Sequence, residues 1–382
     1  MKLKMKFVLL LTFSVFIFCS LGAVSAANNI HDITIDDTHT TIKHYDANIQ
    51  DTNILNKVIK TDYATIHEAG SGFITSSSLY NHITSTKFTD INQGLGGEVQ
   101  NSLINNRVEN AAKPVSIDQG SFDGYIYNCM LNNELKNIND YLEFEQGSYD
   151  DGELVNCLIN NIVENSHGVS LMEQGSSGII HGSIINNLVN DFSYYSTINQ
   201  GSNGGNVQDC MLNNVVNDLN GYCFIGQGTN YGDTYDSMLN NAVISSSGEC
   251  NIRQGLRSFV NNSCLTNTVY ESENTYINQN NISNSRICNG TLFSHETNIN
   301  QGSGLLNSHE SQVSVSNSNL NNLVLCSENT IINETNLSGV FGCVIAIGCD
   351  DYTKTIENLT DTAVFTLTIA NHVIFDFAFS FF

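Results

Sequence analysis

A fixed period of about 27 residues constrains this chain more than any other feature. A Gln, usually preceded two residues earlier by Ile and followed by Gly, recurs from Gln93 to Gln301. A second anchor, an Asn at the end of strings such as LINN and MLNN, recurs from Asn81 to Asn322. The steps cluster at 26 to 28 residues, and only the last few repeats deviate. Self-similarity at such a period is typical of solenoids, in which each repeat packs on its neighbours.

Apolar and polar residues alternate around each Asn anchor, which predicts strands rather than helices. Around Asn187, for example, Ile185 lies two residues before and Val189 two residues after. Parallel strands need long crossovers, and a solenoid supplies one by going once around. Such parallel connections are right-handed. The sequence therefore predicts an all-β fold, a single-stranded right-handed parallel β-helix (β-solenoid) of about ten coils with about 27 residues per coil.

The same alternation places the Asn anchors on the inward side, where a buried amide must be hydrogen-bonded. Stacking identical amides on successive coils, about 4.8 Å apart, joins each to the next. We predict such a structural ladder at one corner of the coil, and a second corner ladder formed by the Gln anchors, with a turn-forming Gly after each. The central Asn residues of the predicted ladder are Asn106, Asn133, Asn161, Asn187, Asn214 and Asn241.

A column of small residues, either Ser or Cys, lies four residues before each Asn anchor. Within it Cys129 and Cys157 fall on adjacent coils, as do Cys223 and Cys250 in the column four before Gln. Stacked Cα atoms lie within disulfide range, so two bridges are possible, while interchange with Ser indicates a small residue in a tight interior position. The cysteines lack the CxxC or Cys/His spacing of zinc sites, so we expect no metal centre and no cofactor.

The first 26 residues have the features of a secretory signal peptide. A basic start is followed by an apolar run from Phe7 to Leu21, and a small-residue cleavage pattern ends at Ala26. We therefore divide the chain into a signal peptide (1–26), an N-terminal cap (27–70), the β-helix repeats (71–339) and a C-terminal cap or interaction segment (340–382). The signal predicts a secreted or cell-surface protein.

The chain is strongly acidic, with a formal net charge of −24. Loss of the three signal lysines would take it to −27 (−24 minus 3). No Lys or Arg occurs between Lys136 and Arg253. Nucleic-acid binding needs a basic footprint, so nucleic acid is excluded as a partner.

An outward acidic column, Asp118, Glu145 and Glu173, lies immediately before the Gln anchors on three successive coils. Stacked carboxylates could share a proton or bind calcium, and a carboxylate pair is what glycoside hydrolases need. A solvated acidic edge explains the same column without chemistry. The loop acids Asp150 and Asp151 match no EF-hand pattern, so calcium is only weakly supported.

The most unusual predicted surface is outward and apolar. Aliphatic residues recur three before and one after the Asn anchors on the central coils, which solvation alone does not explain. We call this set the apolar ribbon: Leu158, Ile162, Ile184, Leu188, Met211, Val215 and Met238. Large exposed apolar patches mark interfaces, so the ribbon is the candidate binding surface. The alternative is that a terminal segment covers it.

The signal peptide, the Asn-rich coils with their LINN and MLNN strings, one Pro and no Trp together resemble adhesin-like β-helix surface proteins. These are abundant in methanogenic archaea and have related repeats in bacterial surface proteins. The resemblance covers residues 70 to about 335. It implies a secreted or cell-surface protein with a structural or binding role. We expect no catalysis, and the candidate partners are cell-surface glycans, proteins or further copies of the chain. The alternative is a polysaccharide-degrading β-helix enzyme, a lyase or a glycoside hydrolase.

Overall fold

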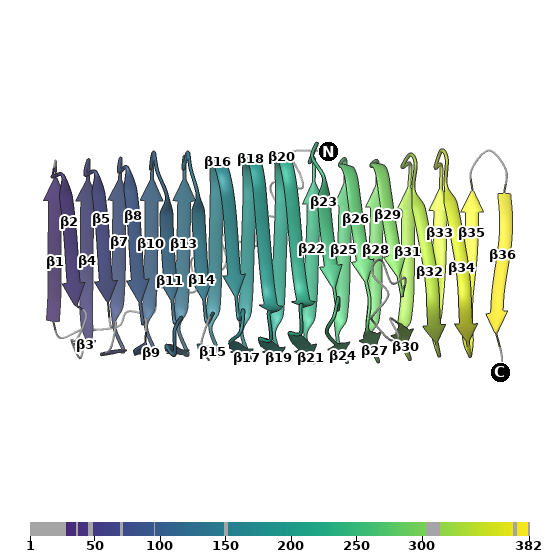
Figure 1. The fold of residues 1–382 in the computed structure, drawn as a ribbon, viewed down its shortest axis with the longest axis horizontal. Helices are drawn as coiled ribbons and strands as arrows, with labels where there is room; N and C mark the ends of the chain where they lie inside the picture. Colours follow the sequence, from purple (N-terminus) through teal and green to yellow (C-terminus); the bar gives the residue numbers. More distant parts are fainter. Residues whose placement is uncertain are drawn as a thin grey trace.

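The computed structural model describes residues 28–35, 37–44, 49–68, 72–94, 96–148, 152–302, 314–369 and 373–380. The predicted signal peptide and the loop acids Asp150 and Asp151 lie outside these residues. The described chain forms 36 strands, β1 to β36, stacked side by side in one long solenoid (Figure 1). It makes about 12 turns whose repeats are about 26 residues apart, which confirms the predicted parallel β-solenoid.

Each coil places strands on three faces. The Asn face, named for its anchor, comprises β1 (Asn28–Ile35), β4 (Thr52–Ile59), β7 (Ser78–Thr84), β10 (Leu103–Glu109), β13 (Met130–Lys136), β22 (Met238–Ile244), β25 (Cys264–Tyr270), β28 (Arg286–Leu292), β31 (Asn319–Leu325), β33 (Phe341–Ile347) and β35 (Thr362–Ile369). Three long strands, β16 (Leu158–Gln174), β18 (Ile184–Ser202) and β20 (Met211–Thr229), run through the Asn face and on into the next face.

That next face, the Gln face, comprises β2 (His39–His44), β5 (Tyr63–Glu68), β8 (Phe88–Gln93), β11 (Val115–Gln119), β14 (Leu142–Gln146), β23 (Cys250–Gln254), β26 (Glu273–Gln279), β29 (His295–Gln301), β32 (Ile331–Ser338) and β34 (Thr353–Thr360). The short face comprises β3 (Ile49–Gln50), β6 (Phe73–Thr75), β9 (Glu98–Gln100), β12 (Tyr125–Tyr127), β15 (Glu153–Val155), β17 (Ile179–His181), β19 (Asn206–Gln208), β21 (Asp233–Tyr235), β24 (Val260–Asn261), β27 (Ile282–Ser283) and β30 (Val315–Ser316).

The stacking extends beyond the predicted repeat region, so the solenoid has more turns than the ten expected. β1 pairs in parallel with β4 and β2 with β5, within the segment predicted as the N-terminal cap. β33 pairs in parallel with β35 in the C-terminal segment. The last strand, β36 (Val373–Ser380), pairs antiparallel with β35 and ends the sheet of the Asn face.

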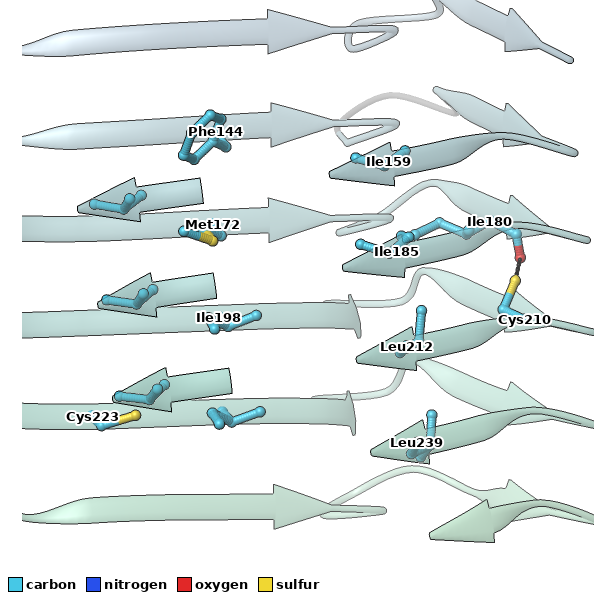
Figure 2. Close-up of a cluster of buried hydrophobic side chains, with 14 of the residues drawn as sticks. Phe144, Ile159, Met172, Ile180, Ile185, Ile198, Cys210, Leu212, Cys223 and Leu239 are labelled. Carbon is cyan, nitrogen blue, oxygen red and sulfur yellow. Dashed lines mark hydrogen bonds between the residues drawn. The ribbon is translucent and has the colours of Figure 1, made fainter. Parts of the chain in front are cut away.

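Inward side chains of equivalent positions stack into a continuous apolar core (Figure 2). On the Asn face, Ile159, Ile185, Leu212 and Leu239 occupy successive rungs and are fully buried. On the Gln face the larger Phe144 and Met172 stack above Ile198. Burying a side chain of this size contributes roughly 1.5–3 kcal/mol, so the repetition supplies most of the driving force for folding.

The Ser/Cys column occupies a turn whose preceding residue has a positive φ, as at Asn156 (53°) and Asp209 (54°). The Ser183 hydroxyl accepts the Cys157 backbone N–H at 3.0 Å and donates to the His181 carbonyl at 3.0 Å. The Cys210 sulfur takes the same place, accepting from the Ser183 N–H at 3.4 Å. A small side chain that both donates and accepts is what the turn requires, which explains why Ser and Cys interchange.

The Asn and Gln anchors, predicted as ladders at two corners, form one buried hydrogen-bonded network. Each Asn Nδ2 donates to the Asn of the next coil, as Asn161 does to Asn187 (2.9 Å). Each Gln Nε2 donates in the opposite direction, as Gln174 does to Gln146 (2.8 Å). The two columns are joined across the interior, for example from Asn187 Nδ2 to Gln174 Oε1 (2.9 Å). All of these amides are buried, so the predicted inward placement of the Asn anchors is confirmed.

A buried carboxyl group ends this network at each end. The Gln donors point toward the N-terminal end, where Glu68 accepts from Gln93 Nε2 (2.6 Å), Asn81 Nδ2 (3.2 Å) and Asn56 Nδ2 (2.9 Å). The Asn donors point toward the C-terminal end, where Asn322 Nδ2 donates to Glu334 Oε1 (3.0 Å). A carboxylate accepts without needing to donate, so it suits the end of a chain of donors.

We expect Glu68→Gln to stabilise the protein at neutral pH. Burial raises the pKa of Glu68 despite hydrogen bonds that lower it. An acid with a raised pKa in the native state loses stability as pH rises from the unfolded pKa through the native one. The variant removes that loss, while its Oε1 can still accept from Gln93 Nε2 and Asn81 Nδ2, the two donors that bond to Glu68 Oε2. Thermal melts should show a gain in melting temperature that grows between pH 4 and pH 7.

The matched control is the exposed Glu249→Gln, which should leave the melting temperature nearly unchanged at every pH. A variant at Glu68 that is less stable than wild type at pH 7 would show that the carboxylate is the preferred end of the network.

Candidate binding surface

The seven residues of the apolar ribbon lie side by side on the outer surface of the Asn face. Leu158, Ile184, Met211 and Met238 are register partners on four adjacent strands, and Ile162, Leu188 and Val215 are partners on three. Ile184 is 36% exposed and Met238 40% exposed, and the other five are half-buried. The predicted outward orientation is therefore confirmed, and Ile184 and Met238 remain in contact with solvent.

A ladder of outward Asn residues separates the two columns of the ribbon. Asn186 Nδ2 donates to Asn160 Oδ1 at 2.8 Å, and Asn213 Nδ2 donates to Asn186 Oδ1 at 2.7 Å. The amides are half-buried and bonded mainly to one another along the solenoid axis. Because the strands are in register and the amides are already paired, the ribbon is a regular sheet surface that offers apolar contact.

The three residues of the predicted acidic column lie next to one another in the structure. Asp118, Glu145 and Glu173 are register partners on β11, β14 and β16 of the Gln face. Burial raises the pKa of Asp118 to about 7, with further contributions from the charges of Asp90 and Glu143. Glu143 points to the same side two residues before Glu145, a neighbour that the sequence reading left out although the alternation indicated it.

This carboxyl cluster has no arrangement for a metal ion. Among the described residues, no group of three or more His, Cys, Asp or Glu side chains could hold one. The raised pKa of Asp118 means that the column carries a proton near neutral pH, which lowers its attraction for cations. What the column offers chemically is a carboxyl group whose pKa is raised to about 7 and which lies beside further carboxyl groups.

The four cysteines considered for disulfides carry free thiols in the structure. Cys223 and Cys250 are register partners on adjacent strands, and Cys129 and Cys157 lie on neighbouring turns. Burial raises the pKa of Cys129 to about 12 and that of Cys157 to about 11. Thiolate is the reactive form, so these buried thiols serve packing and turn formation rather than chemistry.

An aromatic cluster on the Gln face was not predicted from the sequence. Tyr195 and Tyr222 stack with ring centroids 5.0 Å apart, and the Arg253 guanidinium lies 5.2 Å from the centre of the Phe224 ring. The signal that could have revealed it is the recurrence of Tyr five residues before successive Gln anchors. Tyr195 is 36% exposed and Tyr222 is half-buried, so the stacked pair is partly open to solvent.

Comparison with known proteins identifies no related surface. The chain matches no protein-family model and no curated protein in sequence. Within the part of the chain that the structure describes, there is no helix long and apolar enough to cross a membrane.

Proposed function

We propose that this protein is a secreted or cell-surface, adhesin-like structural or binding protein that acts without catalysis through its apolar ribbon. The observation that carries the proposal is the register of Leu158, Ile184, Met211 and Met238 on the outer surface of four adjacent strands. Exposing aliphatic side chains to water is unfavourable, so solvation does not explain why they recur at this position. Burial against a partner would be favourable and does explain it.

Three further features support a role outside the cell. The N-terminal segment ending at Ala26 is a signal peptide in this proposal, and the Asn-rich repeats resemble those of adhesin-like surface proteins. The net charge of −24 favours solubility of an exposed particle. In the same proposal the solenoid is right-handed, as parallel crossovers are, and its partners are cell-surface glycans or proteins.

A double substitution tests the ribbon. Ile184→Lys with Met211→Lys should leave the coils folded, because neither side chain contributes to the interior. It should weaken binding to cells or immobilised glycans by roughly tenfold or more, because each Lys would have to be desolvated in the contact. A binding screen of residues 27–382 and circular dichroism of the variant provide the two measurements.

The matched control places the same charges on the short face, as Asn206→Lys with Gln208→Lys, both exposed. It should bind as wild type does. Unfolding of the ribbon variant would identify the ribbon as covered core, and unchanged binding would identify it as inert surface.

An enzyme remains the second candidate because the pKa of Asp118 is raised to about 7, a value suited to a general acid. Cleavage of acidic or neutral polysaccharides by the wild type, lost in Asp118→Asn with Glu145→Gln and Glu173→Gln, would establish this alternative. The proposal above expects no cleavage by either protein, which reducing-end assays and chromatography of the products would measure.

A further inference from the structure

Five of the seven ribbon residues belong to a larger sheet surface that is almost free of charge, and Leu158 and Ile162 lie next to it on β16. From residues 184–190 of β18 to β35, eight adjacent strands of the Asn face are in continuous parallel register. Among the described outward side chains of these strands, Arg286 is the one that is charged. We call this surface the uncharged face. On a chain with a net charge of −24, such an area is far from what a uniform distribution of charges would produce.

Apolar side chains continue along the uncharged face beyond the ribbon. Leu323, Ile345 and Leu367 are register partners on β31, β33 and β35, and Leu323 is 38% exposed. Beside them Phe341 and Ile347 are also exposed. The ribbon and this second apolar group thus lie toward the two ends of the uncharged face, with Thr266, Thr268 and Arg286 between them.

Charged residues surround this surface on its borders. Toward the N-terminal end, the outward positions of the Asn face carry ion pairs, Arg107 with Glu134 (3.5 Å) and Lys136 with Glu164 (3.1 Å). The turns along its two long edges carry exposed acids: Asp191 and Asp218 on one side, Asp209 and Asp236 on the other. An uncharged centre with a polar rim is the anatomy of a protein–protein interface.

We propose that the uncharged face binds the same face of a second copy of this chain; this rests on the proposed function, in which the ribbon is a contact surface. Elsewhere on the molecule, repulsion between negative charges opposes contact between two copies. At the uncharged face two copies can approach without bringing carboxylates close to one another. A two-fold axis near β25 and β28 would lay each copy's uncharged strands over those of the other. Dimers of this isologous kind are the commonest oligomers.

The available area agrees with this occupant. Eight strands about 4.8 Å apart cover roughly 34 Å, and seven residues at about 3.3 Å span roughly 20 Å. The product, about 700 Å² per partner, is close to the roughly 800 Å² per partner of a standard stable interface. Two sheet faces also pack well against one another, with their side chains interdigitating.

The dependence on salt distinguishes this partner from a charged one. Repulsion between two acidic copies acts through the rims and is screened by salt. Raising NaCl from about 0.05 to about 0.5 M should therefore tighten self-association roughly tenfold or more, as measured by sedimentation velocity over a range of protein concentrations. A basic partner would instead bind more weakly as salt rises.

Two substitutions outside the ribbon test the face itself. Leu323→Glu with Ile345→Glu should raise the dimer dissociation constant roughly a hundredfold, because buried unpaired carboxylates would be brought face to face. The control, Asn206→Glu with Gln208→Glu on the short face, adds the same charge and should change the constant by less than about threefold at about 0.5 M NaCl.

A measurement on the wild type keeps the test independent of folding of the variants. Cys288 lies outward on the uncharged face, whereas Cys326 is exposed on the turn after β31. Alkylation by iodoacetamide should slow at Cys288 as protein concentration rises, and it should stay constant at Cys326.

A chain that stays monomeric to about 100 µM at every salt concentration overturns this inference, as does a dimer in which Cys288 is alkylated freely. If the monomer still binds cells or an insoluble polysaccharide through the ribbon, the proposed function stands and the partner is different. If neither self-association nor binding occurs, both fail together.

Discussion

Replacing Asn187 by Leu should destabilise the solenoid by about 3–5 kcal/mol, because its amide takes part in four buried hydrogen bonds. Asn187 Nδ2 donates to Gln174 Oε1 (2.9 Å) and Asn214 Oδ1 (2.8 Å). Its Oδ1 accepts from Asn161 Nδ2 (2.9 Å) and Gln174 Nε2 (3.2 Å). Leu is similar in size but leaves these groups without their partner, and a buried unsatisfied polar group costs about 1–3 kcal/mol. Urea denaturation followed by circular dichroism measures the loss.

The neighbouring Asn186→Ser is the matched control. Asn186 lies on the outer surface, is half-buried, and its partners Asn160 and Asn213 can turn to water when its amide is removed. We expect a cost of less than about 0.5 kcal/mol, in the range of ordinary surface substitutions. If the Asn186 substitution proved the more costly of the two, the assignment of inside and outside to these columns would be wrong.

The sequence predicted the columns but not how they meet. Spacing places a residue along the coil, and alternation decides its side, so Asn187 and its equivalents could be assigned to the interior. Which inward columns face each other depends on the angle of each turn. That angle is set by positive-φ residues such as Asn165 and Asp191, which no period reveals. The joining of the Asn and Gln columns into one network therefore became visible only in the structure.

The first coils escaped the sequence reading for a related reason. Glu68 occupies the position of the Gln anchor and Asn56 that of the Asn anchor, but neither is embedded in the recurring strings. Glu68 lies in the second coil, and its register partner in the first coil is His44 rather than another amide, so a carboxylate acceptor can replace the Gln there. The anchor residues are thus less regular in the first coils, where the amide network ends.

The candidate surface was predictable in part. All seven residues of the apolar ribbon could be assigned from alternation, because the central coils have nearly constant spacing. The rest of the uncharged face could not, because Leu323, Phe341 and Ile345 lie in coils that follow irregular steps. The buried state of Glu145, 9% exposed although it points outward, depends on packing of neighbouring coils, about which a single column carries no information.

Replacing Lys354 by Met should destabilise the C-terminal coils by about 3–5 kcal/mol, the cost of leaving one member of a buried ion pair without its partner. Lys354 Nζ lies 3.4 Å from Glu334 Oε2, and the two side chains are 9% and 0% exposed. Burial raises the pKa of Glu334, and the charge of Lys354 opposes that rise. Because each coil of a solenoid contacts only its neighbours, the loss should appear locally. Hydrogen exchange should show faster exchange in β32, β34 and β35, with β10 and β13 unchanged.

The double variant Lys354→Met with Glu334→Gln separates charge from packing. The introduced glutamine amide would carry no charge, and its oxygen could accept from Asn322 Nδ2 as the Glu334 carboxylate does, so protection of the C-terminal coils should return to near the wild-type level. The single variant should also recover as pH falls. Without Lys354 the pKa of Glu334 rises further, and protonation removes the buried charge from the native state. Equal exchange rates in the single and double variants would mean that Lys354 stabilises these coils through its aliphatic stem, and that the network at this end needs no cation.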